Sequence, residues 1–321
     1  MADEFTLLDY QQTATPITKA VVKTWREASP ILEMLKFKTT KNLSEEVIRY
    51  QDLPNVGWRK IGEGFTQAKV TPTPVKERVY FMGAKIDIPR EYVNAASIVD
   101  NRAVQSEAIM KGAAFNFNTA FFLNDDAGSV DIDAIVGVHH RIINDLASDQ
   151  SFDANLDVSP DTAVTSWQHK FFDKIEDLLD RVDGNPGDKV LFCGRTMYQR
   201  LQSALRSANL LFTAELAGKQ YMTYGQGGPK IVQAGYKYDQ TTQILGDAES
   251  GTALTGGTDS SLYCVRFGEP YLSGFAQEMP NAEDKGETED GVNVRTIVRF
   301  SPGIYFASPR TMALAYGFTA A

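Results

Sequence analysis

The sequence predicts an α+β fold in which a long hairpin, a long helix and a smaller α/β domain follow one another along the chain. Apolar residues alternate with other residues over 78–89, which is the two-residue period of a β-strand. Over residues 95–123 apolar residues recur every three or four positions, as they do in an amphipathic helix. A helix–strand–helix pattern over residues 160–208 predicts the smaller domain.

Residues 44–88 predict a hairpin whose two strands are residues 45–52 and 78–89. More than twenty residues connect these strands, and several of them are glycine or proline. Connections of this length are usually functional, and a two-stranded ribbon alone is marginally stable in water. We therefore expect something outside its own domain to hold the hairpin.

Residues 16–28 predict an N-terminal helix, because apolar residues recur at helical spacing and a proline occupies the first turn. No large neighbouring element in the sequence covers the apolar face of this helix. Two interpretations stay open: the helix docks on its own domain, or it is an arm that docks on another subunit. The second interpretation places Trp25 at an intersubunit contact.

The predicted helix at 95–123 has an apolar side and a polar side, so we expect it to lie on a sheet rather than in a coiled coil. At a rise of 1.5 Å per residue it forms a rod of about 40 Å. The expected polar side consists of Asn101, Gln105, Lys111, Asn118 and Asn124.

The smaller domain is predicted from a helix at 160–183, a buried strand at 189–194 and a helix at 196–208, with later strands near 230–246. Residues 263–267 and 292–300 predict two further strands. The glycine-rich stretch at 225–230 lacks the Gly-Lys-Ser/Thr ending of a phosphate-binding loop, so we expect a loop that enters a strand. The two cysteines, Cys193 and Cys264, are expected to be buried thiols.

The charge balance argues against strong binding to nucleic-acid phosphates, because the net charge is −9 and the pI is near 5.0. The distribution is uneven: residues 41–90 carry nine basic and six acidic residues, whereas residues 91–321 carry eighteen and thirty. No apolar run reaches the ~18 residues of a transmembrane helix, and the N-terminus lacks a signal-peptide pattern. We therefore expect the chain to be made and kept in the cytoplasm.

Catalytic chemistry has little support in the sequence. His139 and His140, with Asp131 and Asp133 nearby, are the residue types of a metal site, but adjacent histidines on one element point in different directions. A soluble metal-dependent hydrolase is therefore a remote alternative. We predict no catalytic, metal-binding or cofactor-binding residue.

Three segments resemble a known family: residues 121–125 (FFLND), residues 187–205 (GDKVLFCGRTMYQRLQSAL) and residues 294–317 (VRTIVRFSPGIYFASPRTMALAYG). With the order and spacing of the elements, which extend over nearly the whole chain, they resemble the major capsid proteins of tailed bacteriophages. That family has the Hong Kong 97-type fold, shared with encapsulins and herpesvirus capsid floors. The resemblance implies an N-terminal arm at 1–43, an E-loop hairpin at 44–88, a P-domain with a spine helix at 89–145, an A-domain at 146–262, and P-domain return strands with an acidic loop at 263–321.

The resemblance also implies a function. Copies of the chain would assemble into hexamers and pentamers of an icosahedral phage head that encloses double-stranded DNA with few specific contacts. Such a chain is a structural protein of the virion capsid, assembled in the host cytoplasm, without enzymatic activity, cofactor or membrane association. Because the arm begins within the first twenty residues, a separate scaffolding protein is implied, and a portal and decoration proteins are further expected partners. An encapsulin-type compartment is the alternative.

Some members of this family cross-link a hairpin lysine to an asparagine of a neighbouring subunit. The hairpin lysines of this chain are Lys60, Lys69 and Lys76. No motif marks one of them as reactive, so we do not predict this chemistry here.

We expect the hairpin of one subunit to lie over an acidic surface of its neighbour. The hairpin tip has one acid, Glu63, beside the bases Arg59, Lys60 and Lys69. Trp58 and Phe65 are the expected apolar anchors. The leading candidate for the acidic surface is a loop at 278–290, whose charged residues are Glu278, Glu283, Asp284, Lys285, Glu287, Glu289 and Asp290. The alternative is that both charge clusters face water.

Overall fold

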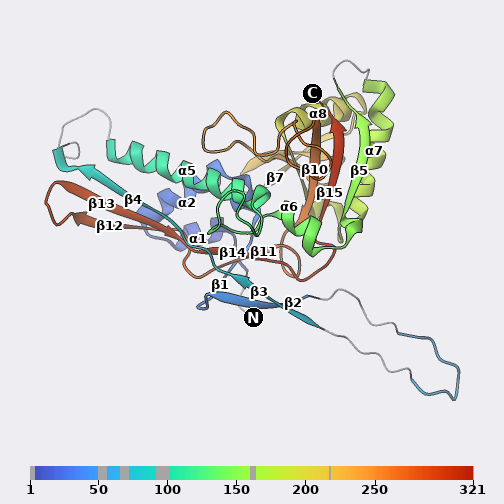
Figure 1. Ribbon diagram of the computed structural model, residues 1–321, viewed down its shortest axis with the longest axis horizontal. Coiled ribbons are helices and arrows are strands. Elements are labelled where there is room, and N and C mark those ends of the chain that lie inside the picture. The colour runs from blue at the N-terminus through green and yellow to red at the C-terminus, as the bar shows by residue number, and fades with distance from the viewer. Residues whose placement is uncertain are drawn as a thin grey trace.

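The structure, a computed structural model, describes residues 4–49, 56–65, 72–91, 101–159, 164–216 and 218–320. A large sheet with helices forms one end of the molecule, a long helix with a narrow sheet forms the other, and a two-stranded ribbon projects from the body (Figure 1). The predicted α+β class is confirmed. In the described part of the chain, no helix is long and apolar enough to cross a membrane.

The N-terminal region packs on its own subunit. It contains the helices α1 (Leu7–Thr13), α2 (Pro16–Ala28) and α3 (Pro30–Met34). Trp25 of α2 is only 1% exposed, and its ring lies edge-on to Phe300 with 5.2 Å between the centroids. Trp25 therefore has no surface left for a neighbour, and the expected intersubunit contact at this residue is wrong. The interpretation that the helix docks on its own domain is the one that the structure supports.

The long helix α5 (Asn101–Leu123) is present as predicted, and the predicted residues 95–100 lie outside the described part of the chain. Its polar side differs from the expectation, because Asn118 and Asn124 are buried. Asn118 accepts a hydrogen bond from the hydroxyl of Ser29. The Asn124 amide donates to three backbone carbonyls of residues 131–135, at 3.0 to 3.2 Å. Buried amides with such partners hold the neighbouring segments against the helix.

A narrow antiparallel sheet packs against α2 and α5 in the order β12 (Asn281–Glu287), β13 (Asn293–Phe300) and β4 (Met82–Pro89). In β4, Ile86 and Ile88 are buried while Lys85 and Asp87 are exposed, so the predicted alternation is confirmed. Two expectations are wrong here. The strand β4 pairs with β13 rather than with residues 45–52, and the expected loop at 278–290 contains the strand β12.

The projecting ribbon consists of β2 (Ser44–Arg49) and β3 (Thr73–Arg78), which are antiparallel. The strand that pairs with the start of the hairpin is therefore 73–78, not the predicted 78–89. Val47 packs with Phe275 and Tyr305 in a small core at the base of the ribbon. Beneath it lies a sheet of β1 (Phe37–Thr39), β11 (Ser273–Ala276) and β14 (Pro302–Tyr305).

The large sheet has seven strands in the order β5-β15-β10-β6-β9-β8-β7. Their bounds are β5 (Ser151–Asp157), β6 (Lys189–Cys193), β7 (Leu211–Leu216), β8 (Lys219–Tyr224), β9 (Lys230–Gln233), β10 (Asp259–Arg266) and β15 (Met312–Thr319). The expected boundary at residue 262 does not hold, because β10 spans it and β15 lies beside β5. The loop expected at 225–230 is the turn between β8 and β9.

This large sheet separates two apolar cores. Its outer face is covered by α7 (Val164–Asp180) and α8 (Arg195–Ser207), which correspond to two predicted helices. Cys193 is buried in this outer core, as is Cys264, and both are free thiols as predicted. Val190 and Phe192 of β6 point to the other face, where Phe192 lies 5.3 Å from Phe122 of α5. Because alternate residues of β6 point to opposite faces, this strand contributes to both cores, and its Phe192 packs the sheet against the long helix.

Candidate assembly surfaces

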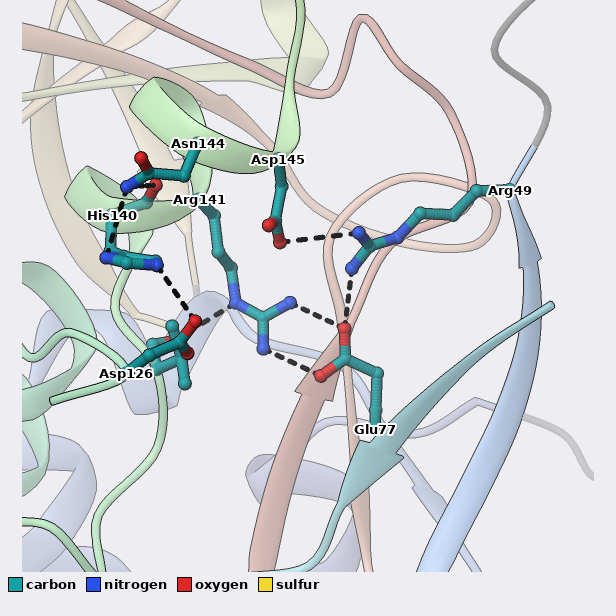
Figure 2. Close-up of polar contacts among 8 residues, drawn as sticks. Arg49, Glu77, Asp126, His140, Arg141, Asn144 and Asp145 are labelled. Atoms are coloured by element: carbon teal, nitrogen blue, oxygen red, sulfur yellow. Dashed lines mark hydrogen bonds and ion pairs between the residues drawn. The ribbon is translucent and has the colours of Figure 1, made fainter. Parts of the chain in front are cut away.

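The ribbon of β2 and β3 is fixed to the body at its base by charged side chains (Figure 2). Glu77 of β3 is buried, and its carboxylate accepts two hydrogen bonds from the Arg141 guanidinium, at 2.7 and 2.8 Å. It accepts a third bond, at 2.6 Å, from Arg49 of β2. Hydrogen bonds between charged groups, and paired bonds above all, are shorter and stronger than neutral ones. Both strands of the ribbon therefore meet at one carboxylate.

The partners from the body come from one helical segment. The short helix α6 (Val138–His140) continues into a wider helical turn at Arg141–Asp145, in which the Leu146 N–H bonds to the Arg141 carbonyl. Arg141 binds Glu77, and Asp145 accepts a hydrogen bond from Arg49 at 3.3 Å. Such wide turns are rare and often occur at functional positions.

The environment of Glu77 keeps its carboxylate charged. Burial alone would raise the pKa of Glu77, but the hydrogen bonds and positive charges of Arg141 and Arg49 outweigh burial and lower it. Arg49 also lies over the ring of Phe306, with 3.9 Å between the guanidinium carbon and the ring centroid. A cation over an aromatic face adds attraction in a partly desolvated site. The base of the ribbon is thus a charged cluster on an apolar support.

The far end of the hairpin exposes large apolar side chains. Residues 56–65 lie beyond the ribbon, away from the body (Figure 1). All of them are exposed, and Trp58 and Ile61 each reach 104% relative accessibility. Phe65 is 85% exposed and lies under the Arg59 guanidinium at 4.4 Å. Exposed apolar side chains that gather on one segment are typical of interaction surfaces.

Four of the predicted tip residues are therefore on the surface together. Trp58, Arg59, Lys60 and Phe65 all belong to the exposed segment, whereas Lys69 lies outside the described residues. The backbone N–H of Lys60 donates a hydrogen bond to the Glu63 carboxylate at 3.4 Å. The one acid of the tip therefore binds the backbone of the tip itself.

The predicted acidic surface is a strand and a turn with its own bases. Glu283 pairs with Lys285, and Glu287 lies 3.3 Å from Arg90. The hydrogen bond from Lys285 lowers the pKa of Glu283. Glu289 and Asp290 occupy the turn between β12 and β13. The hydrogen bond to Asp87 raises the pKa of Arg295, and the charges of Asp290 and Glu289 add to this effect. The negative charge of this edge is thus partly balanced within the subunit.

One subunit does not bring the two predicted surfaces together. The β12–β13 turn and the hairpin tip lie at opposite ends of the molecule (Figure 1). A contact between them requires two subunits.

The cluster at the base of the ribbon was missed by sequence reasoning. Glu77 and Arg141 are 64 residues apart, and neither lies in a recognisable motif. The only available signal was an arginine and an aspartate four residues apart at 141 and 145, a spacing that is common on helical surfaces.

The two adjacent histidines have separate partners. His139 contacts the Tyr263 hydroxyl at 2.8 Å and the Thr252 carbonyl at 3.0 Å, and burial lowers its pKa. His140 lies 3.2 Å from Asp126. Within the described ranges, no group of three or more His, Cys, Asp or Glu is arranged to hold a metal ion.

Comparison with known proteins finds likeness in structure only. No protein-family model and no curated protein matches the sequence. The SrpI encapsulin of Synechococcus elongatus PCC 7942 matches with a TM-score of 0.60 at 11% identity, over 98% of this chain and 95% of its own. The capsid of the empty GTA particle matches at 0.59 and 10% identity over 90% of each chain. The capsid of Myoviridae phage XM1 matches at 0.54 and 10% identity over 86% of each.

These likenesses define the fold of the chain, which it shares with an encapsulin and two capsids. It is the Hong Kong 97-type fold, as found in the major capsid proteins of tailed bacteriophages.

Proposed function

We propose that the chain is a major capsid protein, and that its copies assemble into the hexamers and pentamers of an icosahedral phage head that encloses double-stranded DNA. The observation that carries the proposal is the exposed hairpin tip with Trp58, Ile61 and Phe65, on a chain with a capsid fold. Exposed aromatic side chains on a projecting element gain most when a second molecule buries them.

The contact that we propose joins the hairpin tip of one copy to its neighbour. Trp58 and Phe65 are the anchors, because buried aromatics contribute most at protein interfaces. Arg59, Lys60 and Lys69 would face the β12–β13 edge, with Glu283, Asp284, Glu287, Glu289 and Asp290 as the acidic candidates. Exposed ion pairs of this kind contribute only about 0.2–1 kcal/mol each, so they would set register and association rate more than affinity.

The remaining partners follow from the same proposal. The head would be assembled in the host cytoplasm with a separate scaffolding protein, a portal and decoration proteins, and without enzymatic activity of its subunit. The acidic body of the chain supports confinement of the DNA with few phosphate contacts. Strong, salt-sensitive binding of DNA by the isolated subunit would contradict this part.

An encapsulin-type compartment is the second candidate, and the match with the SrpI encapsulin over 98% of this chain favours it. Electron micrographs of the expressed chain test assembly, and closed icosahedral particles are the expected result. Particles purified from the natural source distinguish the two candidates, because packaged DNA gives excess absorbance at 260 nm. Particles that hold protein and no DNA would favour the compartment, and a chain that stays monomeric at high concentration would contradict both.

A further inference from the structure

Four charged side chains at the base of the ribbon join both of its strands to one turn of the body (Figure 2). Arg49 comes from β2, Glu77 from β3, and Arg141 and Asp145 from the wide turn after α6. Arg49 contacts Glu77 and Asp145, and Arg141 contacts Glu77. A hairpin held by one strand alone can swing about that strand, whereas ties from both strands remove this freedom.

The burial of these groups makes the joint rigid. The side-chain exposure is 3% for Arg141, 11% for Glu77 and 14% for Arg49. Two parallel bonds between Arg141 and Glu77 fix the plane of the carboxylate as well as its position. A buried charge that loses its partner is strongly unfavourable, so a partly opened cluster is costly.

The apolar support strengthens the same geometry. Phe306 is 1% exposed and lies below Arg49 at 3.9 Å and below Arg141 at 5.7 Å. Swinging the ribbon would separate Arg49 from this ring and from the Asp145 carboxylate of the body. The small core of Val47, Val79, Phe275 and Tyr305 fastens the chain at the root of the ribbon, but it does not include the charged groups that contact the turn after α6.

We infer that Arg49, Glu77, Arg141 and Asp145 form a clamp that sets the direction in which the hairpin leaves the subunit. These four are positioning residues: they do not touch a partner themselves, but they aim residues 56–65. The inference concerns one subunit and does not depend on the proposed function, so its test does not require shell assembly.

The direction of the hairpin can be measured as a distance between its tip and the body. Spin labels at Ile61→Cys and Tyr238→Cys would occupy exposed positions, at 104% and 71% exposure, while Cys193 and Cys264 are buried and do not compete for the label. Double electron–electron resonance on the full chain, diluted with unlabelled chain, then gives the distribution of this distance. A change of angle at the base is amplified at the tip.

The test variant is Arg49→Met, because it removes the tie from β2 and leaves the buried pair of Arg141 and Glu77 intact. The expected result is a distribution about twofold broader than that of the parent chain, as a released hinge produces. Arg49→Lys, which keeps the charge but loses the paired geometry, should give an intermediate width.

Arg181→Met is the matched control. Arg181 also contacts two carboxylates, at 2.9 Å to Asp149 and 3.2 Å to Asp177, and lies 4.5 Å over the ring of Phe152. Its side chain is 18% exposed, close to the 14% of Arg49, but it lies beside the large sheet. This variant should keep the parental width. If Arg49→Met keeps it too, or if Arg181→Met broadens it equally, the clamp is refuted. Circular dichroism verifies that each variant is folded.

Discussion

Arg141 and Glu77 form a buried pair with two parallel hydrogen bonds, at 2.7 and 2.8 Å, although 64 residues separate them in the chain. The pair joins the ribbon to the body of the subunit. Its energetics differ from those of an exposed ion pair, because each partner has lost its water.

Glu77→Leu should lower the free energy of unfolding by about 3–5 kcal/mol, because it leaves the Arg141 charge buried without its carboxylate. Adding Arg141→Met should restore much of that loss, since it removes the most deeply buried charge that Glu77→Leu leaves without its partner. Urea denaturation of the single and double variants measures both. Glu107→Leu, whose partner Lys111 is 47% exposed, is the control and should change the free energy of unfolding far less, because exposed ion pairs contribute little. A double variant as unstable as the single one would contradict this account.

The contribution of Glu77 should depend on pH in one direction. Its pKa is lowered in the folded chain from an ordinary value of 4.5. The folded state thus favours the charged form, so the stabilisation is fully present above pH 4.5 and is lost as the pH falls through the lowered pKa. The urea midpoint of the parent chain should approach that of Glu77→Gln on acidification. If the difference between the two urea midpoints stays constant down to about pH 3, the ionisation of Glu77 does not account for the pH dependence of stability.

Reversing the charge of the tip with Arg59→Glu and Lys60→Glu should slow shell assembly without unfolding the subunit. Rim charges mainly control association rate, and the effect should be larger at low salt, where screening is weak. Light scattering follows assembly, and circular dichroism verifies the fold. Lys19→Glu with Lys23→Glu on the exposed face of α2 makes the same change of charge elsewhere and should have a smaller effect. Assembly of the tip variant at the parental rate in low salt would refute the charge contact.

Trp58→Ala should weaken assembly and leave the melting temperature of the free subunit unchanged, because this side chain is fully exposed in the subunit. Burying a large apolar side chain contributes about 1.5–3 kcal/mol, so the critical concentration for assembly should rise roughly ten- to a hundredfold. Sedimentation at a series of concentrations measures it. Tyr238→Ala, 71% exposed on a loop of the body, is the comparison. An unchanged critical concentration would mean that Trp58 remains in water in the shell.

The order of the elements was predictable, but their partners were not. The alternation over 82–89 correctly identified the buried face of β4, since a two-residue period fixes faces. It contains no information on which strand lies alongside, and β13 lies more than 200 residues away in the sequence. The true return strand at 73–78 was hidden because it carries Pro74 and charged residues.

The sequence did not show what the buried side chains of Trp25, Asn118 and Asn124 contact. The spacing of Trp25 shows that it lies on an apolar face, but not whether that face meets its own subunit or another. Asn118 and Asn124 were placed on the polar side of the predicted helix, and such a side normally faces solvent. Their amides instead bind Ser29 and the backbone at 131–135, and such partners become visible only once the chain is folded.

The strand order of the large sheet has a consequence for synthesis of the chain. The strand β5 pairs with β15, and β6 pairs with β10, so early strands lie beside late ones. On the ribosome, residues 151–157 emerge long before residues 312–319, and until then one edge of β5 has no partner. The outer core cannot close before residues 312–319 have left the ribosome, because Ala313, Ala315 and Phe318 are part of it. A nascent chain therefore lacks the finished large sheet until β15 has paired with β5 and β10.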